Sequence, residues 1–363
     1  MISEFKGKRI RSLDFLRGLA IIGVIAVHTN QSFSVKISQL DWIFGCGRFG
    51  VQLFFYVSAI SLCHAWIKRK DEHNKTLNFY VRRFFRIAPF FWTAIPIYLL
   101  IGFLTNGFVN YWSSEGIGFR QIFLTATFLH GFWPDSLNSI VPGGWSIACE
   151  IIFYALFPLI IKNIKYKRNF YFVFAFSIWI LNTFWFQSFL FNFLEKYYIT
   201  SDPDSIKIFL NLNFITQAPI FILGCYLYFL LKVKPKIIEI CLFLAWILFS
   251  GILNWIYEVP NTGFLIIYLI IGFFTYFSIK FNFRFKALEM IGRNSYLIYL
   301  IHFAVIWFLK KIIIIQFGLL DFFIGFIFTL IISYLLATFI SKNFESRIQK
   351  YVTSILSNKN NIV

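Results

Sequence analysis

Long apolar runs separated by short polar segments follow one another along most of the chain. Ten of these runs have about the 20 residues that an α-helix needs to cross a bilayer, and we predict a membrane-spanning helix in each. They cover residues 12–29, 50–67, 88–105, 144–161, 169–190, 206–231, 237–256, 262–279, 290–309 and 319–341. An eleventh run, 121–133, is too short to cross as a helix, so we predict a re-entrant or interfacial segment there.

The composition favours an all-α, polytopic integral membrane protein. Of the 363 residues, 59% are hydrophobic and 14% are charged. Soluble chains have about 45–50% apolar and about 25% charged residues, so we expect lipid to solvate most of this surface. Disordered, disulfide-rich and collagen-like proteins are excluded. Because no polar stretch is long enough for a second domain, residues 1–363 are predicted to form a single membrane domain.

The basic residues predict an orientation in the membrane. A formal net charge of +18 would suggest nucleic acid in a soluble protein, but here the 34 Lys and Arg residues lie mostly between the apolar runs. With ten crossings, one side holds 25 of them and the other side seven, which predicts cytoplasmic termini and no nucleic-acid partner. The five cysteines are scattered without a CxxC pair, so no metal site is predicted.

The first run contains ionisable side chains. Each costs about 2.5 kcal/mol or more inside a span, so we expect each to have a structural or functional role there. Asp14, Arg17 and His28 lie on one face of a helix at 100° per residue. Asp14 and Arg17 are three residues apart near the inner end and can form an ion pair, whereas His28 lies roughly 16 Å further out. The simpler alternatives are a neutralised helix start for the pair and an interfacial role for His28.

Two later runs carry similar polar faces. Ser146, Glu150 and Tyr154 share a face next to Trp145, and Glu150 lies at a depth similar to that of His28. A carboxylate beside an imidazole can orient a catalytic base, although Glu150 could instead pair with a basic residue between helices.

The run that begins near residue 290 has the third polar face. Ser295, Tyr299 and His302 share this face and follow Arg293, with His302 near mid-membrane. The alternative is that they only form hydrogen bonds between helices. His130, a lone histidine in an apolar run, is predicted to be structural.

Three arginines, Arg82, Arg83 and Arg86, lie just before Pro89. Arg83 and Arg86 are one helical turn apart, and paired guanidiniums suit phosphate groups. We predict an amphipathic helix on the inner surface over residues 68–88 and a new helix starting near Pro89. Alternatively, the arginines only anchor the chain to lipid phosphates.

Five motifs follow one another along the chain. They are LDFLRGLA at 13–20 followed by His28, FFYVSA at 54–59, RFFRIAP at 83–89, GWSIACE with FYALFP at 144–158, and NSYLIYLIHF at 294–303. In this order they resemble the motifs of the acyltransferase-3 family of membrane acyltransferases. That family usually has Gly where this chain has Ala59, which bears on close helix approach at this position and not on the assignment.

The resemblance implies an acyl-CoA-dependent carbohydrate O-acyltransferase in the bacterial plasma (inner) membrane. The expected donor is acetyl-CoA, and the acceptor is a glycan hydroxyl on the outer side: O-antigen, capsule, peptidoglycan or a lipid-linked sugar. Membrane lipid is the other expected partner, and the oligomeric state stays open. A fused esterase-like domain, which some relatives carry, is not expected in this chain.

The same resemblance, with the polar faces, gives each candidate residue a role. We predict His28 as general base or as nucleophile, with Glu150 orienting it, and the sequence does not separate the two schemes. Arg17, paired with Asp14, is predicted to contact the donor. The predicted ligands of the donor phosphates are Arg82, Arg83 and Arg86, and the predicted substrate contacts are Trp145, Ser146, Tyr299 and His302.

Two other functions stay open from the sequence. Intramembrane Asp, Arg, Glu and His also line transport paths, so a transporter or flippase of lipid-linked glycans is the main alternative. A helper subunit of a polysaccharide synthase is a weaker one. Only the acyltransferase produces acylated glycan and free CoA.

Overall fold

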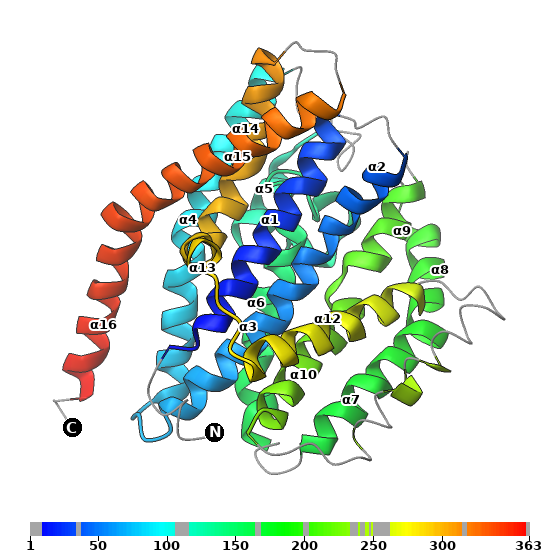
Figure 1. The fold of residues 1–363 in the computed structure, drawn as a ribbon. Coiled ribbons are helices and arrows are strands. Elements are labelled where there is room, and N and C mark those ends of the chain that lie inside the picture. The colour runs from blue at the N-terminus through cyan, green and yellow to red at the C-terminus, as the bar shows by residue number, and fades with distance from the viewer. Residues whose placement is uncertain are drawn as a thin grey trace. The chain divides into compact units, whose positions relative to one another are not determined.

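The computed structural model describes residues 9–33, 38–105, 116–163, 168–198, 203–232, 239, 244–246, 248–249, 262–313 and 318–360. All regular elements among them are helices (Figure 1). Within these ranges, eight helical stretches are long and apolar enough to cross a membrane. They are Arg11–Phe33, Gln39–Lys68, Lys75–Thr105, Gly144–Lys162, Asn169–Tyr197, Ser205–Leu230, Ser295–Ile312 and Leu319–Ser357. The predicted all-α polytopic membrane fold is therefore confirmed.

The structure gives a different result for each of the three remaining apolar runs. Residues 262–279 form α12 (Thr262–Lys280), whereas the predicted span 237–256 lies mostly outside the described residues. The short run 121–133 contains α5 (Phe119–Ala126), which has only eight residues and is too short to cross a bilayer. The count of ten crossings stays a prediction.

The chain's internal contacts divide it into two units. Unit 1 comprises Met1–Lys8, Phe55–Lys68 and Asn106–Phe281; unit 2 comprises Arg9–Phe54, Arg69–Thr105 and Asn282–Val363. The single domain predicted for residues 1–363 stays a prediction.

Unit 2 is built around its first helix. Its elements are α1 (Arg11–Phe33), α2 (Ser38–Gly45), η2 (Cys46–Phe49), the start of α3 (Gly50–Lys68), α4 (Lys75–Thr105), α13 (Lys286–Arg293), α14 (Ser295–Ile312), α15 (Leu319–Ile340), η6 (Ser341–Glu345) and α16 (Ser346–Asn360). Helix α1 packs against α2, η2, α13, α14 and α15, and Figure 1 shows α13 lying beside it.

Glycines allow neighbouring backbones to touch α1. A Cβ added to Gly18 would meet the carbonyl of Leu288, and one added to Gly292 would meet the carbonyl of Asp14. Toward the other end of α1, a Cβ on Gly47 would meet the carbonyl of Gly23. These positions require glycine because any side chain would push the helices apart.

Helix α4 corrects two predictions. It runs without a break from Lys75 to Thr105 with Pro89 inside it, so no helix starts at Pro89 and no separate surface helix covers 68–88. Membrane helices tolerate proline when neighbours supply polar contacts. Here the Tyr296 hydroxyl of α14 donates to the Ile87 carbonyl (2.8 Å), next to the proline.

Three other predicted spans differ from the helices observed: two of them are interrupted and one is longer. The run 290–309 breaks at Asn294, which puts Arg293 on α13 and Tyr299 on α14. The run 206–231 breaks at Asn213, whose side chain accepts hydrogen bonds from the first N–H groups of the next helix. The run 319–341 continues through the π-helical turn η6 into α16.

Unit 1 centres on α10 (Phe214–Leu230), which packs against α6 (Gly144–Asn163), α7 (Arg168–Leu181) and α12. Its other elements are most of α3, α5, η3 (His130–Phe132), η4 (Pro134–Ser136), the π-helical turn η5 (Asn182–Phe186), α8 (Gln187–Tyr197) and α9 (Pro203–Leu212). A Cβ added to Gly224 of α10 would lie 2.7 Å from the Ala59 Cβ. Helices α3 and α10 therefore approach closely at Ala59, and the glycine that permits this contact is Gly224 of α10.

Candidate active site

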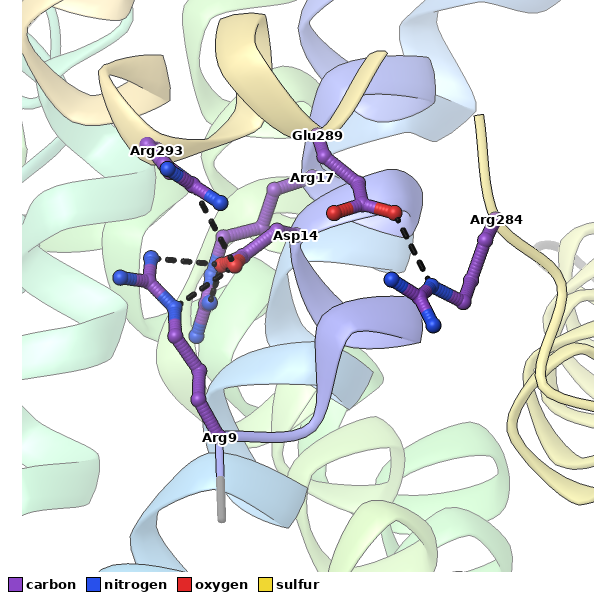
Figure 2. Close-up of polar contacts among 6 residues, drawn as sticks. All are labelled: Arg9, Asp14, Arg17, Arg284, Glu289 and Arg293. Atoms are coloured by element: carbon purple, nitrogen blue, oxygen red, sulfur yellow. Dashed lines mark hydrogen bonds and ion pairs between the residues drawn. The ribbon is translucent and has the colours of Figure 1, made fainter. Parts of the chain in front are cut away.

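Asp14 is the centre of a cluster of three guanidiniums in unit 2 (Figure 2). Its carboxylate is 1% exposed and lies 2.7 Å from Arg9 Nε, 3.2 Å from Arg17 Nη1 and 4.0 Å from Arg293 Nε. The Asp14–Arg17 pair that the spacing predicts is present. Arg9, which the sequence reasoning did not single out, adds a second hydrogen bond through Nη2 (3.0 Å). Among the residues that the structure describes, this one carboxylate faces three cations, so the four side chains together carry a net charge of about +2.

Local structure explains how these side chains meet. Asp14 lies in the first turn of α1, where a carboxylate also interacts favourably with the helix dipole. Arg9 comes just before this helix, and Arg293 is the last residue of α13. Gly292 lets α13 reach the backbone of α1 beside Asp14. A second pair steadies α13, because Glu289 lies 3.4 Å from Arg284 (Figure 2).

Two imidazoles from different predicted faces come together in unit 2. The ring centroids of His28 on α1 and His302 on α14 are 5.5 Å apart. Phe303 packs against both rings, at 4.3 Å from His28 and 4.2 Å from His302. Tyr299 lies 5.6 Å from His302, so the predicted face on α14 is formed at these two residues.

Hydrogen bonds at Nδ1 indicate the tautomer of each imidazole. Nδ1 of His28 lies 2.8 Å from Gln31 Oε1, and Nδ1 of His302 lies 2.7 Å from the Tyr299 carbonyl. Because these oxygens only accept, each Nδ1 carries the proton and each Nε2 carries the lone pair in the neutral ring. Nε2 of the fully buried His302 has no hydrogen-bond partner within the described residues. The pair therefore presents proton-accepting nitrogens.

Unit 1 holds the predicted carboxylate. The Tyr154 hydroxyl donates to Glu150 Oε2 (3.1 Å), and Ser58 Oγ lies 3.2 Å from the same hydroxyl. Glu150 and Tyr154 thus share a face as their spacing predicts, and Ser58 adds a contact that the sequence reasoning missed. His28 belongs to unit 2 and Glu150 to unit 1, so their pairing stays a prediction.

The start of α6 fixes the predicted substrate contacts Trp145 and Ser146. The backbone N–H of Trp145 donates to Asn138 Oδ1 (3.2 Å), which helps to satisfy the first turn of the helix. The Ser146 hydroxyl donates to the Gly143 carbonyl (2.9 Å), so its proton is already used and its oxygen remains an acceptor.

His130 connects the preceding loop to α6. It is 1% exposed, and its Nε2–H donates to the Gly144 carbonyl (3.0 Å), in agreement with the structural role expected from the sequence. Burial removes the ring from water and lowers the pKa of His130 from 6.5 to about 4.

This shift predicts acid sensitivity of the fold. Between pH 6.5 and about 4 the unfolded chain binds a proton at His130 that the folded chain does not. The free energy of unfolding should therefore fall as the pH drops through this window, by at most about 1.4 kcal/mol per pH unit. Thermal unfolding near pH 7.5 and near pH 5 measures the loss, which we expect to be smaller in His130→Gln. An equal loss in both proteins would contradict this assignment.

The three arginines of α4 have different surroundings. Arg82 binds Glu72 through two hydrogen bonds (2.7 and 2.6 Å), and Asn78 donates to the same carboxylate (3.1 Å). Burial alone would raise the pKa of the Glu72 carboxyl, but the Arg82 charge and these hydrogen bonds hold it below its usual value. Arg83 lies over the ring of Phe79, 5.8 Å from its centroid, and Arg86 is exposed.

Arg82 is thus largely neutralised by Glu72, so Arg83 and Arg86 remain the stronger candidates for binding phosphate. Among the residues that the structure describes, no group of three or more His, Cys, Asp and Glu side chains is placed to hold a metal ion.

The fold and these groups define a polytopic membrane protein with buried imidazoles and an arginine cluster. The chain belongs to the acyltransferase-3 family, whose model, described as an acyltransferase domain, matches residues 10–338. No solved structure matches the chain.

Three curated relatives are similar to this chain. Peptidoglycan O-acetyltransferase OatA of Listeria monocytogenes serovar 1/2a is 25% identical over 338 residues, covering 84% of this chain and 50% of that protein. O-acetyltransferase OatA of Staphylococcus aureus strain NCTC 8325 is 26% identical, covering 85% and 52%. A protein of S. aureus strain COL, provisionally named an O-acetyltransferase, is 26% identical, covering 84% and 52%. The chain spans about half the length of these relatives.

Proposed function

We propose that this chain is a membrane O-acyltransferase that moves an acetyl group from cytosolic acetyl-CoA to a hydroxyl of a cell-envelope glycan on the outer side. Family membership and the names of the relatives support the reaction class. Peptidoglycan, named for the Listeria relative, is the first acceptor to test. The observation that carries the proposal is the contact between His28 and His302, with both Nδ1–H groups engaged and Nε2 left to accept a proton.

The chemistry assigned to His28 is general base catalysis. Its Nε2 takes the proton of the acceptor hydroxyl while that oxygen attacks the thioester carbonyl carbon. The tetrahedral intermediate then loses the thiolate, the C–S bond breaks, and the proton passes to sulfur to give the acetyl ester and free CoA. Such proton transfer typically contributes 10²–10⁴-fold. In the alternative scheme, His28 is the nucleophile. The reaction then passes through an acyl-imidazole and gives the same products.

The donor is assigned to the basic end of unit 2. Arg83 and Arg86 on α4 carry the charge needed to hold its diphosphate, because guanidiniums bind phosphate oxygens in a bidentate manner. This end is cytoplasmic in the orientation that the basic residues predict, with both termini inside a bacterial plasma membrane. The thin acyl-pantetheine arm would reach toward His28 while the nucleotide stays in the cytosol.

Unit 1 is assigned to the acceptor. Trp145 offers an aromatic face on which a sugar ring can stack, and the Ser146 oxygen can accept a hydrogen bond from a sugar hydroxyl. Glu150, held by Tyr154 at 3.1 Å, is proposed to stabilise the imidazolium that forms on His28.

Gln31 is expected to matter because it holds the Nδ1–H of His28 at 2.8 Å. Gln31→Leu removes this acceptor, so the tautomer with a basic Nε2 is no longer favoured. We expect kcat to fall about tenfold with KM for acetyl-CoA unchanged, and Gln31→Glu to retain most activity. Steady-state kinetics in nanodiscs measure both constants. Wild-type kcat in Gln31→Leu would show that this hydrogen bond has no role.

The proposed function is tested with purified protein in lipid vesicles. Labelled acetyl-CoA is supplied with peptidoglycan fragments, and acetylated glycan and free CoA are measured in equal amounts. A flippase would change the side on which a lipid-linked glycan is found but would release no CoA. Glycan movement without acetylation would therefore contradict the proposal and favour the transport alternative.

A further inference from the structure

The arginine cluster, defined as Arg9, Arg17 and Arg293 around Asp14, has more positive charge than its own carboxylate neutralises (Figure 2). We propose that this cluster binds a phosphate monoester, namely the 3′-phosphate on the nucleotide head of the acyl donor. The inference rests on the proposed function and adds a second phosphate site to the one assigned to Arg83 and Arg86.

The charge balance points to a doubly charged anion. Asp14 is buried and shared by three guanidiniums, so these four described side chains together carry a net charge of about +2. The other carboxylate close to the cluster along α13, Glu289, is already paired with Arg284. A phosphate monoester carries about −1.5 to −2 at pH 7 and has three acceptor oxygens. It therefore matches the cluster in charge and in hydrogen-bonding capacity.

The geometry leaves N–H groups available to a ligand. Arg9 uses Nε and one Nη atom on Asp14, and Arg293 approaches Asp14 only through Nε at 4.0 Å. A guanidinium has five N–H donors, so each of these two arginines retains donors after contacting Asp14. Their side chains are 61% and 48% exposed, whereas Asp14 is covered. Asp14 thus acts as an internal anchor that holds exposed guanidiniums together.

The cluster is connected to the arginines of α4. The Tyr296 hydroxyl donates to the Ile87 carbonyl at 2.8 Å. Arg293 lies three residues before Tyr296, and Arg86 lies directly before Ile87. The two groups of arginines therefore lie on chain segments that are tied together by one hydrogen bond. A donor head with a diphosphate and a separate phosphate monoester has an anion for each group.

The test compares two donors that differ only in this phosphate. Transfer from acetyl-CoA and from acetyl-3′-dephospho-CoA is measured for the wild type and Arg293→Ala in phosphatidylcholine nanodiscs. We expect Arg293→Ala to raise KM about tenfold for acetyl-CoA and to leave KM for the dephospho donor unchanged. Arg293→Lys, which keeps the charge but loses the planar fork, should give a smaller increase. Arg347→Ala, which removes an exposed guanidinium on α16, should affect neither donor.

Three outcomes would overturn the inference. These are an unchanged KM for acetyl-CoA in Arg293→Ala, an equal rise for both donors, and an effect seen only when phosphatidylglycerol replaces phosphatidylcholine. The last would assign the cluster to a lipid phosphate. If Arg293→Ala does not fold, Arg9→Ala serves instead, because Arg9 lies outside the helices. Wild-type protein that uses neither donor would refute the proposed function as well, whereas a donor-independent effect of the variant would refute only this site.

Discussion

His28→Ala is expected to abolish acetyl transfer while the protein still folds and inserts. The variant removes the Nε2 that accepts the hydroxyl proton, and loss of a general base typically lowers the rate by 10²–10⁴-fold. The expected effect is on kcat, since the donor phosphates are assigned to arginines elsewhere in unit 2. Acetylated glycan formed per minute by purified protein in nanodiscs is the measurement.

The matched control is His73→Ala. His73 lies in the loop between α3 and α4, and its backbone carbonyl rather than its ring accepts from Asn78. We expect wild-type kcat and unchanged thermal unfolding in this variant. Transfer by His28→Ala at a rate within a few-fold of wild type would eliminate His28 as base and as nucleophile.

Gly292→Leu is expected to destabilise unit 2 more than any conservative change at the surface. Even a Cβ at this position would meet the carbonyl of Asp14, and a leucine must displace α13 from α1. Overpacking against backbone typically costs about 1–3 kcal/mol, and we expect the upper end here because backbone atoms cannot rotate away. The displacement would also move Arg293 away from Asp14, so acetyl transfer should fall together with stability.

Gly45→Leu is the matched control for this substitution. A Cβ on Gly45 has nothing within 4 Å, and its φ of −58° suits any residue. Thermal unfolding in detergent compares the two variants. A melting temperature of Gly292→Leu equal to that of Gly45→Leu would contradict the close contact between α1 and α13.

The sequence predicted what depends on neighbours along one helix. Apolar runs gave the helices because crossing a bilayer needs about 20 apolar residues. The spacing of Asp14 and Arg17 gave their ion pair, and that of Glu150 and Tyr154 gave their shared face. The hydrogen bond between His28 and Gln31 could have been predicted in the same way, because Gln31 lies one turn beyond His28 on the same helix.

Contacts between distant segments could not be predicted in this way. Arg293 reaches Asp14 only because the chain breaks at Asn294 and Gly292 permits close packing. The His28–His302 pair likewise depends on how α14 packs against α1, which no local spacing encodes. Pro89 misled the prediction for α4 because proline ends helices in water more strictly than in a membrane protein.

The most direct test of the account is transfer across a sealed membrane. Acetyl-CoA labelled in the acetyl group is enclosed on one side of vesicles containing the purified protein, and peptidoglycan fragments are supplied on the other side. The account predicts labelled acetyl esters on the glycan, an equal amount of free CoA on the donor side, and neither product with His28→Ala. Label on the glycan at the same rate with His28→Ala, or no label with intact wild-type protein, would contradict it.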